Sequence, residues 1–118
     1  MVIMADTRIL HVQTETRGAV PEGAVDLAVH RVRSLLRAAS EPVLFARVKL
    51  AMNADPAVER PAIAQVSVDL NGQLIRARAA GSTMREAVGH ACDRLRIRLD
   101  RAARARRRGQ RRDSLHAH

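Results

Sequence analysis

The sequence is nearly devoid of aromatic residues: Phe45 is the one aromatic side chain among 118 residues, with no Trp or Tyr. Hydrophobic residues still make up 47% of the chain, so a core can form, and that core must be aliphatic. A sheet that binds single-stranded RNA by stacking bases displays aromatic rings, so one Phe disfavours that mode of binding.

Cysteine and long apolar runs are also lacking. Cys92 has no second cysteine with which to form an internal disulfide. No apolar run approaches the roughly 18 residues of a membrane span, and the N-terminus has no secretory signal pattern. We expect one soluble cytoplasmic domain with no membrane partner, because the length is typical of a single core.

Lysine is rare, whereas arginine is abundant. Lys49 is the one lysine among 21 basic residues, and a GC-rich genome would explain that preference, but not the net charge of +9. Residues 94–112 hold ten Arg and one acidic residue, Asp100, whereas the rest of the chain is neutral. Arg binds phosphate oxygens in a bidentate manner, so this basic end predicts a polyanionic partner.

No constellation of catalytic residues is apparent. His90 and Cys92 are two positions apart on a predicted helix and point about 200° from each other, which excludes a local dyad. His116 and His118 alone would bind a metal weakly. The glycines form neither a P-loop nor a dinucleotide-binding motif. We predict no enzymatic activity, no cofactor, no metal site and no small-molecule substrate.

Hydrophobic periodicity predicts the first half of the secondary structure. Residues 8–15 alternate as a strand, and apolar residues at helical spacing predict a helix over residues 21–38. Residues 43–51 alternate as a second strand. The residues expected on its buried face are Leu44, Ala46, Val48 and Leu50.

The strongest local signal is Asn71-Gly72, a pair typical of a two-residue type I′ hairpin turn. The residues on either side of it alternate between apolar and polar. Pairing across the turn sets three apolar pairs on one face: Val68 with Ile75, Val66 with Ala77, and Ala64 with Ala79.

A second helix is predicted from Thr83, which fits a capping box with Glu86. Its apolar stripe consists of Met84, Val88, Ala91, Leu95, Leu99 and Ala102. Arg106 would fall on that stripe as a buried, unpaired charge, so we expect the helix to leave the body by about residue 105.

The chain is therefore expected to divide into a domain over residues 1–105 and a basic disordered tail or linker over residues 106–118. The predicted fold is α+β, in the order β-α-β-β-β-α. Since each helix has one apolar stripe and the strands have one apolar face, we expect a four-stranded sheet with two helices packed on one face.

The segment over residues 66–101 resembles the ribosome hibernation-promoting factor and ribosome-associated inhibitor family. There, an Asn-Gly hairpin leads through Gly-x-Asp-Met-Tyr-x-Ala-Ile into Asp-Lys-Leu-x-x-Gln-Leu. The matching residues are Asn71, Gly72, Gly81, Met84, Ala87, Val88, Asp93, Arg94, Leu95 and Leu99. The match extends over residues 8–105, and Ala-Arg-Val-Lys-Leu in the second strand looks more like the actinobacterial branch.

The resemblance implies that the domain over residues 1–105 binds the small ribosomal subunit, through its 16S rRNA, between head and body. It would occupy the mRNA channel and the A and P tRNA positions, and it would block translation under stress without chemistry. The family's basic residues correspond to Arg31 on the first helix and to Arg94, Arg98 and Arg101 on the second.

Three positions depart from the family pattern: Arg85 replaces a tyrosine, Ile97 replaces an arginine, and Ser34 replaces a lysine. Arg96, next to Ile97, could substitute for the missing arginine. The full set of candidate rRNA-binding residues is Arg31, Arg85, Arg94, Arg96, Arg98, Arg101, Arg104 and Arg108.

A helical wheel separates the arginines of the second helix. Those on one flank of the stripe are Arg94, Arg98, Arg101 and Arg108, those on the other flank are Arg85, Arg96 and Arg107, and those opposite it are Arg104 and Arg111. The row formed by Arg94, Arg98 and Arg101 is expected to meet phosphates. An alternative stays open: an oligomerising interaction domain with an Arg-rich linker and only non-specific RNA affinity.

Overall fold

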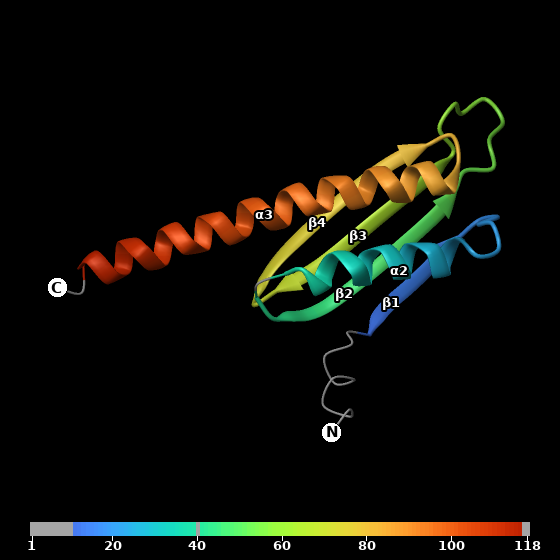
Figure 1. Ribbon diagram of the computed structural model, residues 1–118. Coiled ribbons are helices and arrows are strands. Elements are labelled where there is room, and N and C mark those ends of the chain that lie inside the picture. Colours follow the sequence, from blue (N-terminus) through green and yellow to red (C-terminus); the bar gives the residue numbers. More distant parts are fainter. Residues whose placement is uncertain (1–10, 40, 117–118) are drawn as a thin grey trace, which may run out of the picture.

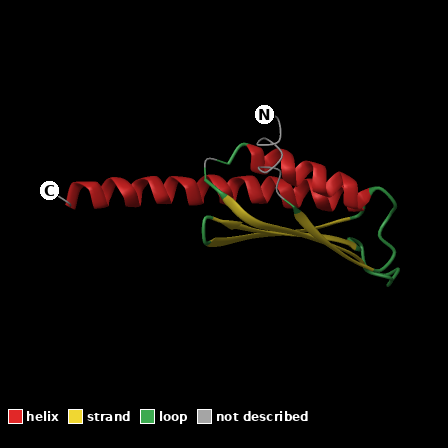
Figure 2. Cartoon of the chain, turned by 90° about the horizontal axis from the view of Figure 1, so that it is seen from below, coloured by secondary structure: helices red, strands yellow, loops and turns green. Residues whose placement is uncertain are grey.

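The computed structural model describes residues 11–39 and 41–116, with side chains through residue 109. Its elements, in chain order, are β1 (Val12–Arg17), α2 (Ala24–Arg37), β2 (Val43–Met52), β3 (Ala62–Leu70), β4 (Gln73–Gly81) and α3 (Met84–His116). The strands form one sheet in the order β1-β2-β3-β4. Both helices cover the same face of this sheet (Figure 1, Figure 2). The predicted α+β fold is confirmed.

Strand β1 pairs parallel with β2, and α2 makes the crossover between them. The sequence predicts this first strand over residues 8–15, whereas the structure gives Val12–Arg17; residues 8–10 lie outside the described residues. Strands β2, β3 and β4 then form an antiparallel meander. The second half of the sheet is therefore contiguous in sequence.

The β3–β4 hairpin has the predicted register, with Val68 opposite Ile75 and Val66 opposite Ala77. Asn71 and Gly72 adopt positive φ values of 52° and 96°, as a type I′ turn requires. The carboxylate of Asp69 accepts a hydrogen bond from the amide of Gly72 at 2.7 Å, which further fixes the turn.

The core is aliphatic, as predicted, and its sheet face is rich in alanine. The buried residues of α3 include the whole predicted stripe, and α2 buries Ala24, Ala28, Val32 and Leu36. Beneath the helices lie small side chains, among them Ala46, Ala62, Ala64, Ala77 and Ala79. Small residues allow the helices to approach the sheet closely, so a dense core forms without aromatic rings.

One prediction about the buried face of β2 is wrong. Leu44 is 61% exposed, because a β-bulge between Val43 and Phe45 sets two residues of β2 opposite one residue of β3. The extra residue changes the alternation, so Val43 packs against the core in place of Leu44. Ala46, Val48 and Leu50 are buried as expected.

The start of α3 follows the predicted cap in part. The amide of Glu86 donates to the Thr83 hydroxyl oxygen at 3.1 Å. The carboxylate of Glu86 accepts from the Ser82 hydroxyl, also at 3.1 Å, one residue before its predicted partner. Together these contacts satisfy backbone and side-chain groups at the helix start.

The end of α3 differs from the prediction. The helix continues to His116, through the segment predicted to be a disordered tail or linker. Ala and Arg are strong helix formers, and residues 101–108 contain nothing else, which favours continuation of the helix. The division into a domain over residues 1–105 and a basic segment over residues 106–118 stays a prediction. In the described part of the chain, no helix is long and apolar enough to cross a membrane.

We expect Gly72→Val to lower the free energy of unfolding by about 1–3 kcal/mol, because a β-branched residue is strained at positive φ. Gly109→Ala also adds a Cβ in open space, but inside a helix, where Ala is favoured over Gly by at most about 1 kcal/mol. This control should not destabilise the protein. Thermal and denaturant unfolding would measure both effects, and an unchanged melting curve for Gly72→Val would contradict the hairpin turn.

Candidate nucleic-acid interface

The two flanks of α3 face different parts of the molecule. Helix α3 packs on β3 and β4 and also contacts α2. One flank therefore borders a groove beside α2, and the other borders β4, which is an edge of the sheet. The arginines that the wheel assigns to opposite flanks consequently have different neighbours.

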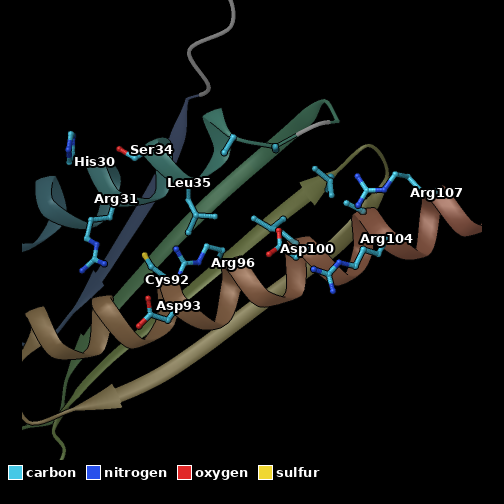
Figure 3. Close-up of a pocket in the computed structure, with 15 residues that line it drawn as sticks. His30, Arg31, Ser34, Leu35, Cys92, Asp93, Arg96, Asp100, Arg104 and Arg107 are labelled. Atoms are coloured by element: carbon cyan, nitrogen blue, oxygen red, sulfur yellow. The ribbon is translucent and has the colours of Figure 1, made fainter.

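A groove of about 730 Å³ runs between α2 and α3. It is lined by His30, Arg31, Ser34, Leu35, Ala38, Ala39, Leu70, Cys92, Asp93, Arg96, Leu99, Asp100, Ala103, Arg104 and Arg107. Figure 3 shows the polar side chains of this groove along both helices. Three candidate residues, Arg31, Arg96 and Arg104, are brought together here from separate helices.

Arg31 reaches from α2 toward α3 (Figure 3). A Cβ placed on Gly89 would lie 3.3 Å from a terminal guanidinium nitrogen of Arg31. The absence of a side chain at Gly89 thus leaves room for the guanidinium above α3. Burial raises the pKa of the Cys92 thiol above its ordinary value, and the charge of Arg31 offsets only part of this rise. Cys92 is therefore a buried, protonated side chain beneath the groove rather than a reactive thiolate.

The groove carries more positive than negative charge. Four arginines line it, and Asp93 and Asp100 are the acidic residues among its lining. Of these four arginines, Arg107 is the one that the sequence analysis does not include among the candidate rRNA-binding residues. The wheel places it on the same flank as Arg96, so its position beside α2 follows once the groove is known.

The opposite flank of α3 lies along the β4 edge. There, guanidinium groups donate to backbone carbonyl oxygens of the strand, Arg94 to that of Arg78 and Arg98 to that of Arg76. A guanidinium has five N–H donors, so each side chain keeps donors that can bind phosphate. The predicted row is thus held against the sheet edge.

The remaining candidates are exposed on α3. Arg85 lies in the first turn of α3 and is not among the residues that line the groove, while Arg101 and Arg108 follow the β4 flank of the helix. The structure does not gather all eight predicted residues into one patch. The groove set consists of Arg31, Arg96 and Arg104, and the edge set consists of Arg94 and Arg98. The remaining three, Arg85, Arg101 and Arg108, are exposed on α3 outside both sets.

The expectation that the helix leaves the body by about residue 105 is wrong at the next residue, where α3 still contacts the body. Arg106 is not unpaired, because its guanidinium lies 3.1 Å from the Glu41 carboxylate and donates to the Asn71 carbonyl at 3.0 Å. The Arg106 and Glu41 side chains are only 28% and 18% exposed. This contact anchors α3 to the loop before β2 and to the hairpin turn.

The other titratable side chains do not converge. His90 lies on the surface, 3.9 Å from Glu86 on the same helix, whereas Cys92 is buried. Within the described residues, no group of three His, Cys, Asp or Glu side chains could hold a metal ion. The geometry of this region favours binding of an anionic partner by arginine.

Two solved structures are similar to this chain. A ribosomal subunit interface protein from Coxiella burnetii gives a TM-score of 0.66 at 17% identity, covering 80% of this chain and 98% of that chain. The Protein Y N-terminal domain from Thermus thermophilus gives a TM-score of 0.62 at 21% identity, covering 78% and 98%, respectively. The chain shares their fold. Neither a protein-family model nor a curated protein matches the sequence.

We expect Arg106→Gln to lower the free energy of unfolding by about 1–2 kcal/mol, because it removes the cation from a largely buried carboxylate. Arg107→Gln is the matched control: Arg107 is exposed, so its replacement should cost less than about 0.5 kcal/mol. A double-mutant cycle with Glu41→Gln measures the coupling. Strictly additive effects of the two substitutions would contradict the ion pair.

Proposed function

We propose that this protein is a ribosome hibernation factor. It binds the small ribosomal subunit through 16S rRNA, occupies the mRNA and tRNA channel between head and body, and blocks translation under stress in the cytoplasm. The Ala-Arg-Val-Lys-Leu segment of β2 favours the actinobacterial-like branch of the family. No chemical step is required, because occupancy of the channel alone prevents mRNA and tRNA from binding.

The arginine groove carries this proposal. It brings Arg31 of α2 together with Arg96 and Arg104 of α3 on a surface formed by two packed helices. Side chains on packed helices lose less conformational freedom on binding than those on a flexible tail. Such a surface suits recognition of rRNA by shape and phosphate contacts, which needs no aromatic side chains.

The fold adds independent support. One structure with this fold is a ribosomal subunit interface protein, and it is matched over nearly its whole length. In our proposal, the groove arginines make the main phosphate contacts. Arg94, Arg98 and Arg101 add contacts along the β4 edge, and Arg85 and Arg108 extend the basic surface along α3.

We expect the protein to bind 30S subunits in preference to random duplex DNA at about 150 mM salt. This ionic strength screens exposed charges beyond about 8 Å and weakens non-specific phosphate binding. Co-sedimentation with 30S subunits, compared with a duplex DNA shift, measures the preference. Equal affinity for both would contradict a ribosomal role and favour an oligomerising domain with non-specific RNA affinity.

The contribution of each arginine set can be separated by paired substitutions to Gln. Replacing Arg31 and Arg96 should weaken 30S binding about 10- to 100-fold, since each contact between an exposed arginine and a phosphate contributes on the order of 1 kcal/mol. Replacing Arg94 and Arg98 should weaken it less, because those guanidinium groups already donate to β4. The latter pair should also cost stability, by about 0.5–1.5 kcal/mol each.

The matched control replaces Arg37 and Arg60, two exposed arginines outside the groove. It removes the same charge and should change 30S affinity and translation inhibition little. If the control pair weakens binding as much as the groove pair, net charge rather than the groove determines binding. If only the edge pair matters, the predicted row, not the groove, forms the interface.

A further inference from the structure

The sheet face opposite the helices is open among the described residues (Figure 2). Its outward side chains come from alternate positions of the strands, and most are polar or charged. The function proposed above uses the helices and the β4 edge and leaves this face without a role.

The register aligns basic residues across the open face in two adjacent rows. In one row, Ser67 of β3 pairs with Arg47 of β2 and with Arg76 of β4. In the next row, Gln65 pairs with Lys49 and Arg78. Four cations therefore stand at the corners of a rectangle, roughly 10 Å across two strand spacings and roughly 7 Å along the strands.

Two acidic residues, Glu15 and Asp69, share this face with the four cations. Glu15 of β1 lies 3.4 Å from Lys49 and is its partner. Asp69 also lies on this face, beside Phe45, where its carboxylate accepts a hydrogen bond from the Gly72 amide. Within the described residues, Arg47, Arg76 and Arg78 have no carboxylate within salt-bridge distance. Three exposed arginines thus remain available for an anionic ligand.

An aromatic ring lies directly beside the basic rows. Phe45 is two positions before Arg47 on β2 and pairs with Asp69, which in turn pairs with Leu74. Phe45 is 36% exposed and Leu74 is 54% exposed. Asp69 lies between them on β3, so Phe45 offers a single stacking position rather than part of an apolar patch. Phe45 and the basic rows therefore share one face of the sheet.

We propose that the open sheet face binds single-stranded RNA, with the phosphates along the two basic rows and one base stacked on Phe45. A base can stack on a side chain only when it is unpaired, so the ring favours a single strand over a duplex. An acidic peptide would match the cations but would leave Phe45 without a stacking partner. The choice of RNA over DNA rests on the proposed ribosomal function.

The composition of the chain, with its one aromatic ring, disfavours RNA binding by base stacking alone. Several aromatic rings are needed for a sheet that binds mainly by stacking, and only one is present. Here the phosphate contacts supply most of the affinity and one stacked base fixes the position of the strand. The arrangement is a backbone-binding surface with a single stacking position.

The first test measures binding of the full chain to oligouridine of about twelve nucleotides, within the roughly 4–16 nucleotides that a single-strand-binding domain covers. Replacing Arg47 and Arg76 with Gln should weaken binding at least tenfold. It should also reduce the slope of log affinity against log salt by roughly 1.4, at about 0.7 for each phosphate that is no longer neutralised. The Arg37 and Arg60 double variant is the matched control and should leave the slope unchanged.

The second test examines the stacking position. Phe45→Leu keeps an apolar side chain but removes the ring, and it should weaken oligouridine binding about 5- to 100-fold. Phe45→Trp introduces the one Trp of the chain. Its fluorescence should be quenched by oligouridine and unaffected by a duplex RNA of the same length.

Three results would overturn the inference. Equal weakening of binding in the sheet and control variants would show attraction to net charge alone. Competition by polyglutamate as strong as that by oligouridine would assign the face to acidic peptides. Fluorescence of the Phe45→Trp variant that changes with protein concentration but not with oligouridine would assign the Phe45 position to self-association. Binding to 30S subunits is measured separately, with the groove variant, so failure of either proposal leaves the other testable.

Discussion

The packing of α3 on the alanine-rich face of β3 and β4 determines where the charges of this protein lie. The stripe from Met84 to Ala102 fits against small side chains, and this contact fixes the rotation of the helix about its axis. Since residues on a helix differ by about 100° in direction, every arginine then has a defined neighbour. Arg96 faces the groove beside α2, whereas Arg94 and Arg98 reach the β4 edge. A different rotation would bury guanidinium groups.

The sequence predicts the elements of this fold well because its signals are local. The Asn71-Gly72 turn specifies its own backbone conformation, and the alternation around it determines the hairpin register. The bulge at Val43 could not be predicted, since a single extra residue leaves the alternation of β2 equally regular in sequence. The pattern therefore assigns Leu44 to the wrong face. Of the strand pairings, that of β3 with β4 follows from the sequence, because a two-residue turn joins the two strands.

The candidate site was predictable only in part. A helical wheel separates the arginines of α3 into flanks, but it does not show what each flank faces. Only the tertiary structure brings Arg31 to Arg96, and only it reveals that Arg106 finds Glu41, a residue 65 positions earlier in the chain. The sequence offers no local partner for Arg106. For that reason the sequence pattern predicts that α3 stops contacting the body just before this residue. A long-range ion pair of this kind leaves no local pattern to detect.

The contacts of Arg94 and Arg98 with β4 have a consequence for the solubility of the protein. An edge strand exposes unpaired carbonyl and amide groups on which a strand from another molecule can add, and such addition is a common route to aggregation. Here two carbonyls of β4 accept hydrogen bonds from α3. Bulky charged side chains also lie along that edge. An incoming strand would have to displace both arginines, so the same residues that give the helix its positive flank protect the β4 edge from strand addition.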